Sequence, residues 1–450
     1  MRICSAQVQA FAHMDGMIQR CSDDIGVPDF GLKLEILKEE FLPLGIPDFK
    51  GKPVNDKIRF RLTVTGNGIE GWRLNIKKKN DAIIYSCHSA TRELDGVVVV
   101  SPIKPKVSKN SGGGVSSSGA IESKRFWPAG EYIIKWNGFD NNGIYDSATL
   151  VGTEFVAEID GHAGGRCRKV NTAPFLFEYV EVKWVDLKIN VNSKRVDVTL
   201  RVNLKDGGAS GAECVRWVNH VCPWDLVPES AIAKSGNRPP LKERSRSFAQ
   251  LKNLALSGLR YHWGRNDGHV VGKSVMIDAS YYEVFVDPVD TERRSMDDIK
   301  LMFNTNGKWM RSGNPGSAKD LISWGANVIP ERIAYNAGYV DGADWYENPN
   351  WYYRTEGNED IEFKETSAHE IGHEILKSYG TTSYSYKHKG STTLFTQETL
   401  ESTPNYPTSG EIDLMKYYQN WIPYDQRDRI VAAEEDVLGL LWLSKIRVEN

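Results

Sequence analysis

The 450-residue sequence has few cysteines and no long apolar run. Its 6 cysteines are too sparse for a scaffold held together by disulfides, although an even number permits bridges. The apolar stretch DGVVVVSPI is far too short to span a bilayer, and the N-terminus lacks the apolar core of a secretory signal peptide. The sequence therefore predicts cytoplasmic synthesis without a standard signal peptide and no integral membrane segment.

A large excess of charge of one sign is also missing. The net charge is only −3, with 26% charged and 40% hydrophobic residues, which is typical of a soluble globular protein. Nothing in this balance indicates nucleic acid as a partner. A chain of this length is too long for one ordinary core, so we expect two or three domains.

The N-terminal half is predicted to be all-β. After an N-terminal segment at 1–50, residues 51–205 contain runs such as RFRLTV and RVDVTLRVNL, in which every second residue is apolar. This alternation is typical of half-buried strands and predicts a β-sandwich-like region. The Gly/Ser-rich stretch 108–120 interrupts the region and predicts a loop or linker.

One segment of this region predicts a hairpin. Residues 128–147 combine an apolar strand with Asn and Gly turns, which accept positive φ at low cost. The segment resembles the W-N/D-G-x-D-x-x-G hairpin of an immunoglobulin-like module in flagellar hook-capping proteins, through Trp136, Asn137, Gly138, Asp140 and Gly143. The resemblance implies an immunoglobulin-like sandwich with a structural or partner-binding role.

A second domain is predicted after a boundary at 206–245, where the chain is rich in Gly, Pro and charge. Residues 246–260 have apolar side chains at helical spacing, and residues 424–446 read as another long helix. The region 246–450 is therefore expected to be an α+β domain.

This second region carries a metal-binding motif. KETSAHEIGHEILKSYG, residues 364–380, contains the pattern H-E-x-x-H at His369, Glu370 and His373. On a helix, residues four apart share a face, so two imidazoles can reach one ion. Gly380 supplies a helix stop. An alternative interpretation of Glu370 is a helix-capping box with Ser367.

A catalytic zinc ion needs a third protein ligand and an open position for water. The sequence offers His388, Glu398, Glu401, Glu411 and Asp413 for this role. We expect Glu411, because Gly410 could begin a helix whose Glu411, Met415 and Tyr418 share one face toward the metal helix. The alternative third ligand is His388, a polar loop histidine.

The motifs HEIGHEIL, HKGS and GEIDLMKYY together resemble metallopeptidase toxins of the bacterial type VI secretion system, over about residues 360–421. The resemblance implies a zincin-like domain in which His369, His373 and Glu411 hold Zn²⁺ and Glu370 is the catalytic base. The chain departs from the extended metzincin pattern, which requires Gly and His where this sequence has Leu376 and Tyr379.

The resemblance also implies a biological context. A secreted antibacterial effector of this kind would act in the periplasm of a target cell and would be matched by an immunity protein. Because the sequence shows no spike domain of its own, the β-rich half is a candidate for docking to a secretion spike or adaptor.

The predicted reaction is zinc-dependent hydrolysis of a peptide bond in a protein or a cell-wall peptide. Glu370 would act as general base, and Tyr417 or Tyr418 could donate to the tetrahedral oxyanion unless they are core aromatics. The competing hypothesis is a non-catalytic β-sandwich binding protein with a structural zinc site. A structural site should recruit a fourth protein ligand, so the ligand number distinguishes the two.

Overall fold

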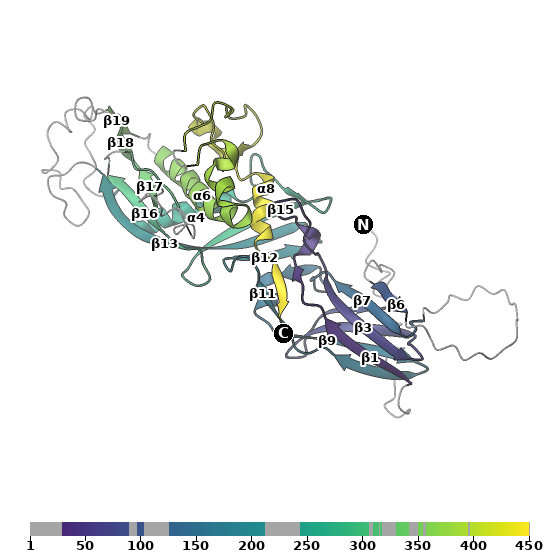
Figure 1. Cartoon of the computed structure of the whole chain (residues 1–450). Helices are drawn as coiled ribbons and strands as arrows, with labels where there is room; N and C mark the ends of the chain where they lie inside the picture. The colour runs from purple at the N-terminus through teal and green to yellow at the C-terminus, as the bar shows by residue number, and fades with distance from the viewer. Residues whose placement is uncertain are drawn as a thin grey trace.

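The computed structural model describes most of the chain, over residues 29–89, 97–102, 126–211, 244–305, 309–314, 316, 330–341, 350–353, 357–394 and 397–449. The predictions for residues 1–28 and for the Gly/Ser-rich stretch 108–120 lie outside these ranges. The molecule is β-rich and multidomain, as the sequence predicts. It is elongated, with an all-β part at one end and the long helices toward the other (Figure 1).

The all-β part consists of two four-stranded antiparallel sheets. One has the order β1 (Phe30–Ile36), β3 (Ile58–Gly66), β7 (Gly130–Trp136), β6 (Val97–Pro102), and the other the order β10 (Arg166–Asn171), β9 (Phe155–Ala163), β4 (Gly71–Lys78), β5 (Ile83–His88). Side chains of β3 alternate between buried and half-buried, as expected for a strand with one face in a core. Phe60 and Leu62 share this core with Leu74 and Ile76 of the other sheet.

The predicted hairpin at 128–147 is wrong, although its turn is present. Strand β7 pairs with β3 and β6, whereas β8 (Ile144–Asp146) pairs with β12 (Val185–Asn190) in a different sheet. Between them, Gly138 and Gly143 adopt positive φ, and the Asp140 carboxylate accepts a hydrogen bond from the Ile144 N–H. The turn therefore sends the chain from one sheet into the next.

A seven-stranded mixed sheet underlies the second part of the molecule. Its main path has the order β14 (Val275–Ile277), β15 (Ser280–Asp290), β13 (Arg195–Gly211), β12, β8, and β16 (Asp298–Thr305) joins β13 to β17 (Arg332–Asn336). Strand β13 pairs in parallel with β15 along its first half and with β16 along its second. It continues past residue 205, where the sequence places the end of the β-sandwich region.

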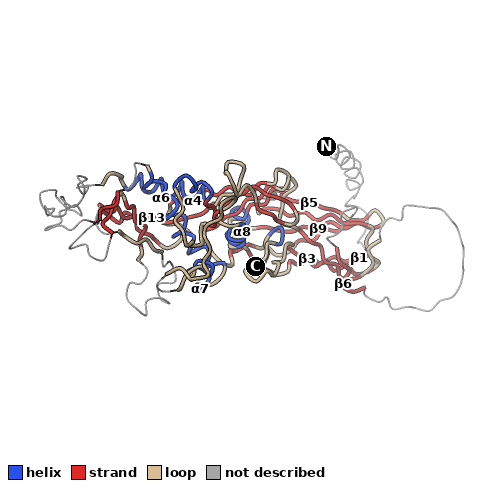
Figure 2. The backbone as a smooth tube through the Cα atoms, turned by 90° about the horizontal axis from the view of Figure 1, so that it is seen from above, coloured by secondary structure: helices blue, strands red, loops and turns tan. Residues whose placement is uncertain are grey.

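Helices α4 (Phe248–His262) and α6 (Asn358–Tyr379) lie together against this sheet (Figures 1 and 2). Helix α4 matches the prediction for 246–260. The two helices approach so closely that a Cβ on Gly258 would lie 2.2 Å from the carbonyl oxygen of Lys364. At the end of α4, the Trp263 indole N–H donates to the Ala368 carbonyl at 3.1 Å. Helix α6 is therefore held rigidly over the sheet.

The predicted long helix at 424–446 is divided into three elements. These are a 3₁₀ helix η6 (Tyr424–Arg429), a short strand β21 (Ile430–Val431) and helix α8 (Glu434–Trp442). Strand β21 pairs in parallel with β20 (Ile412–Asp413). Within the described ranges, no helix combines the length and the apolarity that crossing a membrane would require.

A three-stranded sheet joins distant parts of the chain. Its order is β11 (Leu176–Tyr179), β22 (Ile446–Glu449), β2 (Glu40–Phe41), so the C-terminal strand lies between two N-terminal ones. Beside it, the buried Lys445 ammonium pairs with Glu40 at 2.8 Å and Glu181 at 2.9 Å. The remaining elements are α2 (Ser147–Val151), α7 (Thr382–Tyr386), η1 (Pro43–Gly45), η5 (His388–Gly390), β18 (Gly338–Asp341) and β19 (Asn350–Tyr353).

Candidate metal centre

Helix α6 carries the H-E-x-x-H motif in its C-terminal half. It begins at Asn358, well before Ser367, so the capping-box interpretation of Ser367 and Glu370 is wrong. It ends before Gly380, whose N–H donates to the Leu376 carbonyl at 2.8 Å. His369 and His373 lie one turn apart, with ring centroids separated by 4.9 Å.

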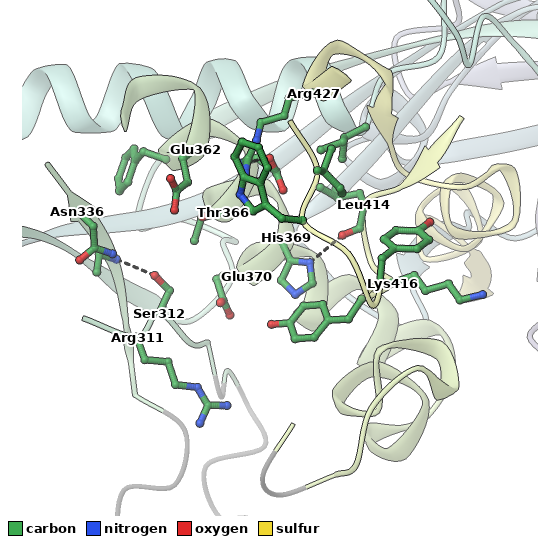
Figure 3. A pocket seen from close by; sticks show the side chains of 18 of the residues that line it. Arg311, Ser312, Asn336, Glu362, Thr366, His369, Glu370, Leu414, Lys416 and Arg427 are labelled. Carbon is green, nitrogen blue, oxygen red and sulfur yellow. Dashed lines mark hydrogen bonds and ion pairs between the residues drawn. The ribbon is translucent and has the colours of Figure 1, made fainter. Parts of the chain in front are cut away.

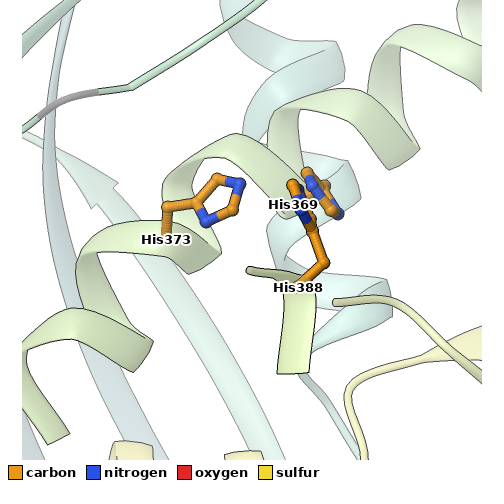
Figure 4. A group of neighbouring side chains, drawn as sticks. All are labelled: His369, His373 and His388. Atoms are coloured by element: carbon orange, nitrogen blue, oxygen red, sulfur yellow. The ribbon is translucent and has the colours of Figure 1, made fainter. Parts of the chain in front are cut away.

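A third histidine joins them from outside the helix. His388 lies in η5, after the short helix α7, and its ring centroid is 5.1 Å from that of His369 and 4.9 Å from that of His373. The three side chains are buried, and their ligand nitrogen atoms all lie within 4.8 Å of one another. Figure 4 shows the three rings converging. They are close enough to bind one metal ion.

In two of these rings, one nitrogen forms a hydrogen bond and the other has none among the described residues. The Nδ1 of His369 lies 2.8 Å from the Leu414 carbonyl oxygen, and the Nδ1 of His388 lies 2.9 Å from the Thr392 hydroxyl. The Nε2 atoms of His369 and His388 are buried and have no hydrogen-bond partner among the described residues. Buried polar atoms are nearly always paired, so these two nitrogens fit a metal ion as their partner.

His373 is oriented in the same way. The Ser385 hydroxyl donates to the His373 carbonyl at 2.8 Å, so its oxygen is left to accept from the His373 Nδ1 at 3.1 Å. Burial lowers the pKa of all three histidines, to about 2 for His388 and well below the usual value for His373. Neutral imidazole is the form that binds metal, so the site presents its ligands in the required state.

The prediction that Glu411 is the third metal ligand is wrong. Its carboxylate lies outside the histidine group and forms a bidentate ion pair with the buried Arg265, at 2.7 and 2.9 Å. No helix begins at Gly410, because the chain enters strand β20 instead. The structure therefore brings the alternative ligand, His388, to the two helix histidines. Of the other candidates, Asp413 pairs with Lys389, and neither Glu398 nor Glu401 belongs to the described metal-ligand group.

A turn at 413–417 packs against helix α6 and orients His369. The Asp413 carboxylate accepts the Met415 N–H at 2.9 Å, which holds the turn that presents the Leu414 carbonyl to His369. Met415 is buried against the helix, where a Cβ on Gly372 would lie 2.5 Å from the Met415 sulfur. The same Cβ would lie 2.8 Å from Cζ2 of the buried Trp263, so glycine at this position lets Met415 and Trp263 pack directly against the helix.

Glu370 faces a cavity of about 340 Å³ that His369 and Tyr417 also line (Figure 3). Glu370 is only 8% exposed, and burial raises the pKa of its carboxyl group to about 8. The positive charge of Arg311 and a hydrogen bond from the backbone of Asn314 oppose this rise. A bound dication would also favour the carboxylate.

Arg311 and Asn314 interact with Glu370, although no sequence motif indicates them. Their segment, 309–314, runs beside β17, with hydrogen bonds of 2.9 and 3.0 Å between Gly313 and Arg332. In Figure 3 it forms the wall of the cavity opposite His369. The Asn314 carbonyl accepts the Tyr386 hydroxyl at 2.8 Å, and the Tyr386 ring stacks on His373. Asn314, whose backbone holds the Glu370 carboxylate, is thereby linked through Tyr386 to the candidate ligand His373.

The two candidate tyrosines have different environments. The Tyr417 ring stacks on His388 with centroids 3.9 Å apart, and burial followed by the Glu370 charge raises its pKa. The phenol is therefore kept protonated and able to donate. The Tyr418 oxygen accepts the Asp413 N–H at 3.0 Å, which gives Tyr418 a part in holding the turn.

The loop that carries His388 is strained and held by ion pairs. His388, Lys389 and Gly390 all have positive φ, of 45°, 56° and 88°, which costs a non-glycine residue about 1–3 kcal/mol. The half-buried Lys389 side chain binds Asp413 at 2.7 Å and Asp436 at 3.0 Å. These pairs connect the loop to the supporting turn and to α8.

Replacing Lys389 with Met should therefore weaken metal binding. We expect a loss of about 10-fold in Zn²⁺ affinity, the lower end of what supporting residues contribute, measured by competition with a chromophoric chelator. Lys387→Met, in the same loop but with an exposed side chain, is the matched control. Equal affinities in the two variants would show that Lys389 does not position His388.

No protein-family model and no curated protein sequence matches the chain. Among solved structures, it is similar to a Parabacteroides merdae β-glucuronidase, with 9% identity and a TM-score of 0.18, over 45% of this chain and 20% of that one. It is also similar to apo Bacteroides uniformis β-glucuronidase 3, with 8% identity and a TM-score of 0.17, over 64% of this chain and 24% of that one. The chain thus spans at most about a quarter of either structure. TM-scores this low bear on neither fold nor activity.

Proposed function

We propose that the protein is a zinc-dependent peptide-bond hydrolase with a zincin-like catalytic region. One observation carries the proposal: three buried histidines converge, and one of them, His369, lines the same cavity as the buried Glu370. The ligands are His369, His373 and His388.

The ligand number favours a catalytic ion over a structural one. Three histidines leave a fourth position open for water, whereas structural zinc sites are closed by four protein ligands. The described residues contribute only three ligand side chains to this group. When bound there, Zn²⁺ would lower the pKa of a water molecule toward about 7 and polarise the scissile carbonyl.

The chain's own residues supply the proton transfers. Glu370 takes a proton from the attacking water and delivers it to the leaving nitrogen, so one carboxyl group acts first as base and then as acid. The backbone of Asn314 holds that carboxylate in place. Tyr417, whose ring is fixed against His388, donates its phenolic hydrogen to the developing oxyanion.

We also propose that the enzyme is a secreted antibacterial effector that acts in the envelope of a target cell. The support is the resemblance of HEIGHEIL, HKGS and GEIDLMKYY to type VI secretion metallopeptidase toxins. In this proposal, the β-rich part is the candidate for docking to a secretion spike or adaptor, and an immunity protein protects the producing cell.

The proposed activity is tested by removing and restoring the metal. We expect purified protein to contain one zinc per chain by elemental analysis and to cleave members of a mixed peptide library. Chelation should abolish cleavage, and stoichiometric Zn²⁺ should restore it, because the fourth zinc position serves catalysis. A protein that retains one zinc but cleaves no peptide would favour the non-catalytic alternative.

A further inference from the structure

Of the tryptophans whose side chains the structure describes, two are exposed, and both line the cavity that contains Glu370. Trp309 is 50% exposed and Trp421 is 60% exposed. The other six tryptophans whose side chains the structure describes are at most 8% exposed. Exposed apolar groups that gather in a concave site mark ligand-binding positions, and these two indoles gather at the candidate catalytic cavity.

Trp421 is held in place although its indole is open to solvent. Its ring meets the edge of Tyr424 with centroids 5.4 Å apart, and the Arg427 guanidinium lies 5.9 Å from its centre. Tyr424 donates to Glu362 at 3.0 Å, and Arg427 pairs with Glu365 at 2.5 Å, so both supports are tied to α6. The indole is therefore preorganised beside the metal-binding helix.

We propose that Trp421 and Trp309 form a substrate subsite for a large apolar or aromatic side chain of a polypeptide. This inference rests on the proposed peptidase function and names its substrate class. Ile422 also lines the cavity and, with the two indoles, gives it apolar surface that suits an apolar or aromatic side chain. Cell-wall peptides carry small or charged side chains, so the subsite selects proteins over cell-wall peptides.

The position of the subsite follows from helix geometry. Tyr424 and Arg427, which hold Trp421, bind Glu362 and Glu365. These two carboxylates precede His369 by seven and four residues. At 1.5 Å per residue, this separation is roughly 6–10 Å along α6. An extended substrate advances about 3.3 Å per residue, so the subsite should hold the side chain two or three residues from the cleaved bond.

The test is cleavage of a randomised peptide library by the zinc-loaded wild type and by Trp421→Ala, Trp309→Ala and Tyr281→Ala. Tyr281 is a matched control, since it is 68% exposed and does not line the cavity. For wild type we expect enrichment of Phe, Tyr, Trp or Leu two or three residues from the cleaved bond. With the best peptide, Trp421→Ala should lower kcat/KM by about 10- to 100-fold. With an analogue of that peptide in which Ala replaces the preferred side chain, Trp421→Ala should change kcat/KM by less than about twofold.

The outcomes separate this inference from the function on which it rests. If wild type cleaves peptides without this preference, or if Trp421→Ala behaves like Tyr281→Ala, the subsite is overturned and the peptidase proposal stands. Cleavage of cell-wall peptides alone would also overturn it. If the zinc-loaded wild type cleaves nothing, the proposed function fails and the subsite fails with it.

Discussion

Glu370→Gln is expected to lower kcat for peptide cleavage by about 10²–10⁴-fold, the range for loss of a general base. Glutamine has nearly the same shape and can still accept the hydrogen bond from the Asn314 backbone, but it cannot take up a proton. Zinc content should stay at one per chain, because Glu370 is not among the clustered ligand candidates. The measurements are steady-state kinetics on a cleaved library peptide and elemental analysis.

Glu359→Gln is the matched control, since this carboxylate lies on the same helix and lines the same cavity. Its kcat should remain close to that of wild type. If the protein is directed to the periplasm of a sensitive bacterium, wild type should arrest growth and Glu370→Gln should not. Full turnover by Glu370→Gln would remove this residue from the mechanism, and equal toxicity would remove peptide hydrolysis from the toxin proposal.

The second large effect is expected at the third ligand. His388→Ala should weaken Zn²⁺ binding by more than about 100-fold, since changes to supporting residues alone cost 10–100-fold. Glu411→Gln should leave Zn²⁺ affinity unchanged, because that carboxylate is engaged by Arg265. Both affinities can be measured by chelator competition. Spectra of the Co²⁺-substituted proteins would report the coordination directly.

The two variants together discriminate between the ligand sets. Glu411→Gln should instead lower the stability of the fold, because the buried Arg265 loses its charged partner. Thermal unfolding of the metal-free proteins measures this effect separately. Loss of zinc in Glu411→Gln with retention in His388→Ala would restore the ligand set expected from the sequence.

The local part of the site could be predicted from the sequence, because it depends on helix geometry alone. The spacing of His369 and His373 places them on one face of any helix, and the structure has a helix there. A prediction based on this four-residue separation needs no information about the rest of the chain. The same holds for α4, whose apolar spacing and Ser247 cap are local signals.

The third ligand could not be predicted in this way, because it depends on how two loops pack against α6. Helical spacing at Glu411, Met415 and Tyr418 was misleading, since Asp413 instead accepts the Met415 N–H and forms a turn. An Asp that starts a turn is a recognisable signal, but it does not reveal which carbonyl the turn will present. The positive φ of His388, which helps to orient its ring, follows from the packing of its loop and is not specified by local helical or strand periodicity.

For the β-rich part, alternation predicted strands but not their partners. The burial pattern of β3 follows directly from RFRLTV, because successive side chains point to opposite faces. Pairing is a long-range property, so the hairpin expected from β7 to β8 was replaced by a passage between two sheets. The parallel partners of β13, which come from residues 280–305, leave no mark on its own sequence.

The position of β22 affects how the chain can reach its final form. This strand is the last regular element, and it lies between β11 and β2, which are translated hundreds of residues earlier. During synthesis, those two strands have unpaired edges until residues 446–449 have left the ribosome. The sheet can therefore close only once residues 446–449 are available, and deleting these residues should leave two exposed strand edges prone to aggregation.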